Sequence, residues 1–280
     1  MIPRLQLFEL EDQQWFPTVP RDLATDYLRF METRLALHRP AVALVAELLG
    51  TTSADAVVDL CSGGGGPIER VRDDLDAQGL AVRFTLTDRY PNLPAFGRAA
   101  HASGGRVTYA AEPVDARDVP GDLRGVRTLF NALHHFAPRD AVAVLRNAAL
   151  ARQPIGVFEM LPTRSVPALL MMLTLTPVLV VLATPFIRPF LWRRLLWTYV
   201  LPVVPLTCWW DGVVSLLRAY TVPELEQLAR EVRVQGFAWR AGRVPIGSTQ
   251  GKLTARPAIS MAASGAKITP VWTIAASMKG

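Results

Sequence analysis

The chain has 280 residues, of which 50% are hydrophobic and 19% are charged. This apolar share excludes an intrinsically disordered chain, and two cysteines are too few for a disulfide-stabilised scaffold. The length suits one principal domain with an insertion. Charge is divided unevenly, because residues 1–160 hold 17 basic and 20 acidic residues, whereas residues 161–280 hold 13 basic and 4 acidic ones. The basic second part suggests an anionic partner.

The first 50 residues predict two helices. Charged residues such as Arg4 and Glu9 interrupt the start of the chain, so no secretory leader is predicted and we expect a cytoplasmic location. Apolar residues recur at helical spacing over 21–37. A second helix is predicted over 41–49, where Gly50 ends it.

The most informative motif is a glycine loop that follows a buried strand. Val57 and Val58 precede Asp59, and four consecutive glycines at 63–66 lead to Pro67, which opens an amphipathic segment. Glycine lets backbone N–H groups approach a ligand closely, and proline suits a first helical position. A helix N-terminus behind such a loop favours anionic ligand groups. The layout predicts a nucleotide-type cofactor site at the carboxyl end of a first parallel strand.

Three further strand-like runs each lead to a polar residue. The second strand ends in Asp88, the third is followed by Asp115, and the fourth ends in Asn131. An acid at the tip of the second strand is where α/β cofactor folds hold ribose hydroxyls. The predicted strands cover residues 83–88, 107–111 and 126–131.

In this order the motifs resemble the class I S-adenosylmethionine-dependent methyltransferases. They are Asp-Leu-Cys-Ser-Gly-Gly-Gly-Gly at 59–66, Thr-Asp at 87–88, Val-Asp-Ala-Arg-Asp at 114–118 and Asn-Ala-Leu-His-His-Phe at 131–136. The resemblance implies an α/β fold, with a doubly wound, mostly parallel seven-stranded sheet of order 3-2-1-4-5-7-6. A dinucleotide-binding dehydrogenase is disfavoured, because the glycines lack the Gly-x-Gly-x-x-Gly spacing.

The resemblance also implies a role for each motif. The glycine loop is expected along the methionine part of S-adenosylmethionine, Asp88 at the ribose, Asp115 near the adenine and Asn131 facing the reacting methyl group. The family's first motif glycine is replaced here by Cys61. The predicted cofactor-binding residues are Asp59, Cys61, Ser62, Gly63, Gly65, Asp88, Arg89, Asp115, Ala116, Asn131 and Ala132.

Methyl transfer needs in-line positioning and, for some acceptors, a base. His134 and His135 are candidate bases because histidine titrates near neutral pH. Glu159, in a fifth predicted strand over 155–160, is the next catalytic candidate. The structural alternatives are a histidine pair that supports the strand end and a hydrogen-bonded acid. Four histidines and two cysteines show no ligand spacing, so no metal is predicted.

After the fifth strand comes a long apolar insertion. No residue from Val166 to Ile187 is charged, and Leu195 to Trp210 is a second uncharged run, with Arg188, Arg193 and Arg194 between them. The length of the first run makes it a transmembrane candidate, but prolines divide both runs. Three alternatives stay open: a soluble lid over an apolar substrate pocket, a helical hairpin in the membrane interface with arginines and tryptophans at headgroup level, and a true span.

Asp211 is the lone acid inside this apolar stretch and needs a partner if it is buried. Arg218, seven residues later, lies on the same helical face and is the expected partner, with a substrate-facing Asp211 as the alternative.

The last part of the chain predicts one more helix and a closing hairpin. Thr221 and Glu224 have the spacing of a capping box. An antiparallel pair is expected between 234–244 and the chain from Lys252 onward. The tail from Arg256, rich in alanine, serine, threonine and glycine, has no functional interpretation.

These expectations divide the chain into four parts: an N-terminal helical cap over the cofactor site (1–50), a cofactor-binding α/β core (51–161), an apolar helical insertion (162–219) and a last helix with closing strands and tail (220–280). The predicted enzyme transfers a methyl group from S-adenosylmethionine to a hydrophobic or lipid-like small molecule and releases S-adenosylhomocysteine. The alternatives are a membrane-associated protein that binds S-adenosylmethionine without methyl transfer, and another S-adenosylmethionine-dependent reaction on the same fold.

The expected partner is a hydrophobic small-molecule substrate. The aromatic and basic residues flank an apolar run and form no stacking platform, so no nucleic acid is expected. The hairpin alternative adds peripheral attachment to the inner face of the membrane. The sequence leaves the oligomeric state open.

Overall fold

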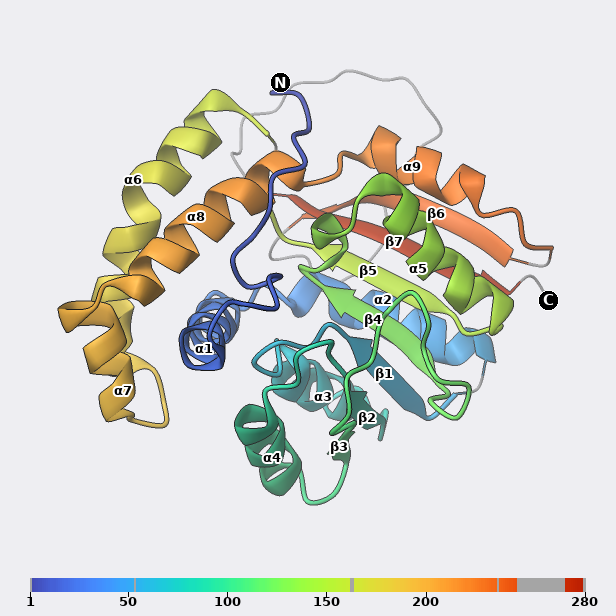
Figure 1. Ribbon diagram of the computed structural model, residues 1–280. Coiled ribbons are helices and arrows are strands. Elements are labelled where there is room, and N and C mark those ends of the chain that lie inside the picture. Colours follow the sequence, from blue (N-terminus) through green and yellow to red (C-terminus); the bar gives the residue numbers. More distant parts are fainter. Residues whose placement is uncertain (1, 53, 162–163, 236, 246–269, 279–280) are drawn as a thin grey trace.

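The computed structural model describes residues 2–52, 54–161, 164–235, 237–245 and 270–278. One seven-stranded sheet has the order β3-β2-β1-β4-β5-β7-β6, which confirms the predicted fold class and strand order (Figure 1). The first five strands are parallel to one another. They are β1 (Ala56–Leu60), β2 (Arg83–Leu86), β3 (Val107–Tyr109), β4 (Val126–Phe130) and β5 (Ile155–Glu159).

The sheet closes with two antiparallel strands. β7 (Pro270–Met278) pairs with β5, and β6 (Phe237–Pro245) pairs with β7. The expected closing antiparallel pair is present, and its second strand lies inside the sheet between β5 and β6. The expectation that this strand begins at Lys252 falls on residues outside the described ranges.

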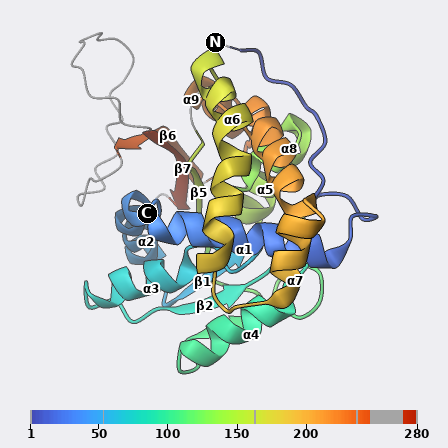
Figure 2. The ribbon, with the colours of Figure 1, turned by 90° about the vertical axis from the view of Figure 1, so that its left-hand side faces the viewer.

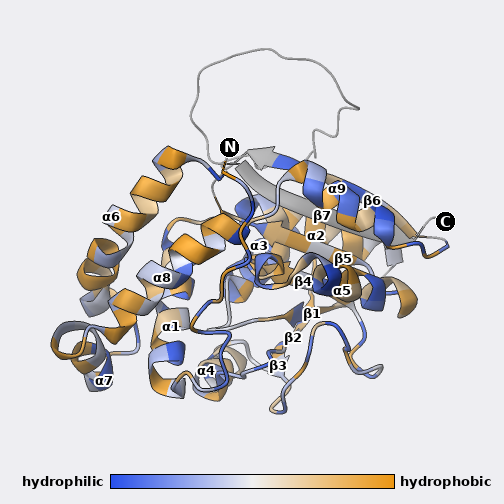
Figure 3. Ribbon diagram, turned by 45° about the horizontal axis from the view of Figure 1, so that its top comes forward, coloured by the Kyte–Doolittle hydropathy of each residue, from blue (hydrophilic) through white to orange (hydrophobic). Residues whose placement is uncertain are grey.

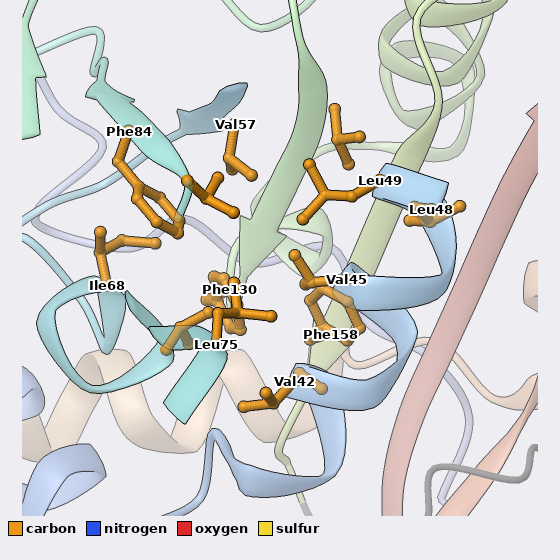
Figure 4. Packing of buried hydrophobic residues seen from close by; sticks show 14 of the residues in the cluster. Val42, Val45, Leu48, Leu49, Val57, Ile68, Leu75, Phe84, Phe130 and Phe158 are labelled. Carbon is orange, nitrogen blue, oxygen red and sulfur yellow. The ribbon is translucent and has the colours of Figure 1, made fainter. Parts of the chain in front are cut away.

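Helices cover both faces of the sheet. On one face, α2 (Arg39–Thr52), α3 (Ile68–Asp76) and α4 (Leu93–Ala102) form a core with the strands, and Figure 4 shows the side chains of α2 beside Phe130 and Phe158. On the other face, α5 (Pro138–Leu150) and α9 (Val222–Glu231) form a second core. All residues of β4 and β5 are buried, as expected of parallel strands covered on both sides. The predicted capping box of Thr221 and Glu224 starts α9.

A third cluster joins the N-terminal helix to the insertion. The helix α1 (Thr18–Arg34) packs Leu23 and Tyr27 against Val180 and Val204. Figures 1 and 2 show α6 and α8 side by side, with α1 beside α8. The insertion consists of α6 (Val166–Ala183), η2 (Thr184–Phe186), α7 (Trp192–Leu195), η3 (Leu196–Val200) and α8 (Val203–Arg218).

The segment before α1 crosses α8 and supplies partners that the sequence pattern did not indicate. Asp211 accepts hydrogen bonds from the backbone N–H groups of Leu10 (2.7 Å) and Glu11 (3.2 Å). Arg218 contacts Glu9 and Asp12, both at 3.1 Å. The expected pairing of Asp211 with Arg218 is therefore wrong, because each side chain finds its partner in a segment about 200 residues away in the sequence.

Candidate functional site

A cavity of about 350 Å³ lies at the carboxyl ends of β1, β2 and β4. Parallel strands end together at this edge, so the loops that follow them meet there. Cys61 and Gly63 line the cavity from the loop after β1, Asp88 from the loop after β2, and Asn131 from the end of β4. The wall formed by α1 contributes Thr25, Leu28, Arg29 and Glu32.

The glycine loop packs tightly beneath α1. Cys61 has a φ of +57°, a left-handed conformation that glycine adopts more readily, so the turn forms although cysteine replaces the family's glycine. A Cβ atom on Gly64 would lie 2.9 Å from the backbone oxygen of Thr25. Only glycine therefore allows α1 to approach the loop this closely.

Asp88 connects the second strand to the loop. Its Oδ2 accepts a hydrogen bond from the N–H of Gly63 at 2.8 Å, and its Oδ1 accepts one from the N–H of Tyr90 at 2.8 Å. Burial raises the pKa of Asp88 above its ordinary value. Each carboxylate oxygen has a further lone pair for a ligand hydroxyl.

Asp59 supports the loop from below and does not line the cavity. Its side chain is buried and accepts hydrogen bonds from the hydroxyls of Ser62 (2.7 Å) and Thr128 (2.6 Å). Burial raises the pKa of Asp59 to about 7. The geometry supports a positioning role for this predicted cofactor-binding residue.

The predicted adenine-site acid is already paired. Arg117 donates to Asp115 through Nη2 at 2.6 Å and to Asp140 through Nη1 at 3.0 Å. The hydrogen bonds from Arg117 lower the pKa of Asp115. Arg117 and Asp140 line the cavity, whereas Asp115 and Ala116 do not.

The end of β4 places an amide beside an acid of α1. Asn131 donates from Nδ2 to Oε1 of Glu32 at 2.5 Å and accepts from the N–H of Met160 at 2.6 Å. Burial raises the pKa of Glu32 to about 7. The cavity therefore contains a carboxyl group that titrates near neutral pH, the range expected of a general base.

His134 and Glu159 form a buried pair outside the cavity lining. The Nδ1 of His134 lies 2.6 Å from Oε2 of Glu159, and Oε1 accepts from the N–H of Leu133 at 2.7 Å. Burial alone would raise the pKa of Glu159, but His134 outweighs it and the pKa is lowered. This pair holds the turn η1 (Leu133–His135) against β5.

His135 lines the cavity and faces acids of the N-terminal segment. Its Nδ1 lies 2.9 Å from Asp12 and 3.0 Å from Glu9. Burial alone would lower the pKa of His135, but Glu9 and Asp12 raise it well above its ordinary value. Ligand atoms of Glu9, His134 and His135 lie within 4.8 Å of one another, a grouping that the sequence spacing does not indicate. The carboxylate of Glu9 is already paired with Arg218 at 3.1 Å and with His135 at 3.0 Å.

Eight of the predicted site residues line the cavity and six do not. Those outside its lining are Asp59, Gly65, Asp115, Ala116, His134 and Glu159. The N-terminal helical cap over the site was predicted, but the residues by which α1 lines the cavity were not named, although residues 25, 28, 29 and 32 follow helical spacing on one face. The predicted residues in the lining are Cys61, Ser62, Gly63, Asp88, Arg89, Asn131, Ala132 and His135.

Comparison with solved structures finds the same fold in methyltransferases. The plantazolicin methyltransferase BpumL in complex with SAH aligns with a TM-score of 0.52 at 12% identity, covering 93% of this chain and 96% of that chain. Its complex with a pentazolic desmethylPZN analog and SAH aligns with a TM-score of 0.52 at 12% identity over 96% and 97% of the two chains. No protein-family model and no curated protein sequence matches this chain. The fold is that of the class I S-adenosylmethionine-dependent methyltransferases.

Proposed function

We propose that this protein transfers a methyl group from S-adenosylmethionine to a hydrophobic or lipid-like small molecule. The observation that carries the proposal is the single cavity in which the glycine loop, Asp88 and the end of β4 face α1. BpumL, which shares the fold, was solved with SAH and with a pentazolic desmethylPZN analog, which supports S-adenosylmethionine as cofactor and a small molecule as acceptor.

The residues of the cavity fit the proposed cofactor. Asp88 would hold ribose hydroxyls through the free lone pairs of its carboxylate, and the backbone around Gly63 would follow the methionine part. When bound, S-adenosylmethionine supplies a methyl group that its sulfonium already activates. The chain then has to align the acceptor with that methyl group and exclude water.

Glu32 is the proton acceptor that we propose for this reaction. It lines the cavity beside Asn131, and its raised pKa of about 7 leaves a substantial fraction ionised near neutral pH. Glu32 would accept the proton that the acceptor's heteroatom loses when it takes the methyl group from bound S-adenosylmethionine, which would leave as S-adenosylhomocysteine. The raised pKa of His135 keeps its imidazole protonated near neutral pH and favours a role as a fixed positive charge.

The walls of the cavity support an apolar acceptor. Leu28, Phe130 and Phe136 are lining residues, together with charged residues of α1 and of the strand ends. Apolar walls with a few directed polar groups are typical of small-molecule sites.

An unbiased product search tests the proposal. The purified chain is incubated with S-adenosylmethionine labelled in the methyl group and with a lipid and metabolite extract from the source cell. We expect label in an organic-soluble small molecule, and Asp88→Asn should reduce its yield. Cofactor binding by calorimetry without labelled product would favour the non-transferring alternative, and absence of cofactor binding would contradict both.

A further inference from the structure

The insertion exposes a continuous apolar surface on α6. The helical stretch Val166–Phe186 contains an 18-residue segment with a mean hydropathy of 2.4. Only 6% of this segment is buried in the protein. Val180 is the one buried residue of α6. A packed lid would bury Leu169, Leu173, Leu179 and Val181, but Leu173 is exposed and the other three are only half-buried. Figure 3 shows α6 as a hydrophobic helix at the edge of the molecule. The exposed large side chains of this stretch are Val166, Leu170, Met171, Leu173, Leu175, Val178, Leu182 and Phe186.

Two prolines in this stretch each leave one backbone carbonyl without its helical hydrogen-bond donor. Aromatic side chains of the insertion donate hydrogen bonds to both carbonyls. A proline has no N–H to donate to the carbonyl four residues earlier. Pro177 therefore leaves the oxygen of Leu173 without its helical donor, and the indole N–H of Trp209 donates to it at 3.0 Å. Four residues before Pro185, the oxygen of Val181 accepts from the hydroxyl of Tyr199 at 2.7 Å.

The hydroxyl groups of two threonines in the same stretch also form hydrogen bonds with carbonyls of the stretch itself. Thr174, on the exposed face, donates its hydroxyl to the carbonyl of Leu170 at 2.8 Å, and Thr184 donates to the carbonyl of Val180 at 2.8 Å. Water would satisfy such groups on an ordinary exposed surface. Internal donors become necessary where water is absent, as in the apolar part of a bilayer.

The charge of the insertion complements an anionic lipid surface. No residue from 161 to 210 is acidic, and four are arginines. Arg194 and Arg164 are buried, with Arg194 2.7 Å from Asp26 and Arg164 2.9 Å from Glu224. The hairpin alternative placed Arg194 at headgroup level, and for this residue that placement is wrong. Arg188 and Arg193 remain exposed beside the aromatic residues of the α6–α8 turn.

We propose that the exposed face of α6 and the turn 186–201 form a membrane-docking surface, which lies in the headgroup–acyl boundary of one anionic leaflet. In this placement Phe190, Trp192 and Tyr199 lie at the interface, where aromatic side chains are favoured, and Arg188 and Arg193 meet lipid phosphates. The inference concerns the insertion and does not depend on methyl transfer. For a chain in the cytoplasm, the surface is the inner leaflet.

Interfacial docking fits the packing of α8 better than a transmembrane span. One side of α8 lies against α6 and another side against α1, whose far side lines the cavity. The ion pair between Arg194 and Asp26 fixes the turn to α1 as well. A bilayer that surrounded α6 would also have to surround α8 and the charged residues of α1.

Vesicle flotation of the full chain tests the docking surface. We expect flotation with vesicles of phosphatidylcholine and phosphatidylglycerol, weaker flotation with phosphatidylcholine alone, and release by high salt. Leu170→Glu with Leu182→Glu should lower the bound fraction by more than about tenfold, because charges would enter the apolar boundary. Arg188→Glu with Arg193→Glu should lower it by about tenfold or more on anionic vesicles only.

Matched variants place the same changes elsewhere on the surface. Leu150→Glu replaces an exposed leucine at the end of α5, and Arg124→Glu with Arg233→Glu reverses two exposed arginines outside the insertion. Both should bind vesicles like the wild type, and circular dichroism checks that every variant is folded.

Three outcomes would overturn the proposal. The first is a wild type that stays in the soluble fraction with anionic vesicles at low salt. The second is a dimer in solution that Leu170→Glu dissociates while no flotation occurs, which would assign the surface to a second copy of the chain. The third is retention of the wild type on membranes after an alkaline carbonate wash, which would make α6 a span.

Discussion

The α/β core and the insertion contain similar apolar residues and use them in opposite ways. In the core, every residue of β4 and β5 is buried between helices on both faces. In the insertion, a helix of higher hydropathy turns most of its apolar side chains outward. A hydrophobic run therefore shows that a segment avoids water, and its surroundings decide whether protein or another apolar phase covers it.

The two regions also differ in where their polar groups point. Asp88 and Asn131, at the strand ends of the core, converge with Glu32 of α1 on a cavity. In the insertion, Thr174, Tyr199 and Trp209 point back to carbonyls of α6. The first arrangement offers polar groups to a ligand, and the second withdraws polar groups from the surface.

The sharpest test of this contrast compares one truncation in each region. Phe158 is fully buried and stacks on Phe130 with ring centroids 4.9 Å apart, so Phe158→Ala should lower the free energy of unfolding by about 3–5 kcal/mol. Leu170 on α6 is 55% exposed, so Leu170→Ala should change the free energy of unfolding by less than about 0.5 kcal/mol. Urea unfolding measures both. Equal losses would show that the face of α6 is covered in solution.

Replacing Glu32, the proposed base, tests whether the polar groups of the cavity take part in catalysis. Glu32→Gln should lower kcat by roughly a hundredfold, the usual contribution of a general base. Since the base must be ionised, kcat/KM of the wild type should rise as the pH increases through about 7, and the glutamine variant should lose this rise. If His135→Asn abolishes the rise and Glu32→Gln does not, His135 is the base.

Replacing Asp88 should weaken cofactor binding but leave the fold intact. Asp88→Asn removes the charge that would hold ribose hydroxyls, so binding of S-adenosylmethionine should weaken by about 1–3 kcal/mol. Calorimetry measures the affinity, and Asp122→Asn, at an exposed acid outside the cavity lining, is the control. Unchanged affinity in a folded Asp88→Asn variant would remove Asp88 from the cofactor site.

The contact between α1 and the glycine loop predicts opposite effects at two glycines. Gly64→Ala places a Cβ 2.9 Å from the oxygen of Thr25 and should destabilise the protein by about 1–2 kcal/mol while weakening cofactor binding. Gly97 lies in α4 with nothing within 4 Å of an added Cβ, so Gly97→Ala should stabilise by about 0.5–1 kcal/mol. Thermal unfolding gives both signs, and a stabilising Gly64→Ala would contradict the close approach.

The core could be predicted from the sequence because its signals are local. The first five strands are short runs rich in apolar and β-branched residues, the glycine loop and the strand-end residues follow them, and the capping box of Thr221 and Glu224 spans four residues. The resemblance supplied the strand order, which is confirmed. Local patterns and order together place Asp88 and Asn131 at one edge of the sheet.

What could not be predicted depends on contacts between distant segments. The partners of Asp211 and Arg218 come from residues 9–12, and no spacing within α8 indicates them. His134 and Glu159 were candidates by type, but their burial follows from a turn that folds onto β5. A closing antiparallel pair was expected, but the sequence did not indicate where in the long segment after Lys252 its second strand lies, and β7 occupies Pro270–Met278 between β5 and β6.

The smallest predicted effect concerns the carbonyls that the prolines of α6 leave free. Trp209→Phe keeps an aromatic ring and removes the N–H that binds the oxygen of Leu173, a loss of about 1 kcal/mol where water is excluded. Vesicle binding should therefore fall roughly fivefold, while stability in solution changes little because water can replace the donor. Trp210→Phe is the control, since its indole donates to Phe8 in the N-terminal segment. Equal vesicle binding by the wild type and both variants would mean that water reaches this side of α6 in the docked state.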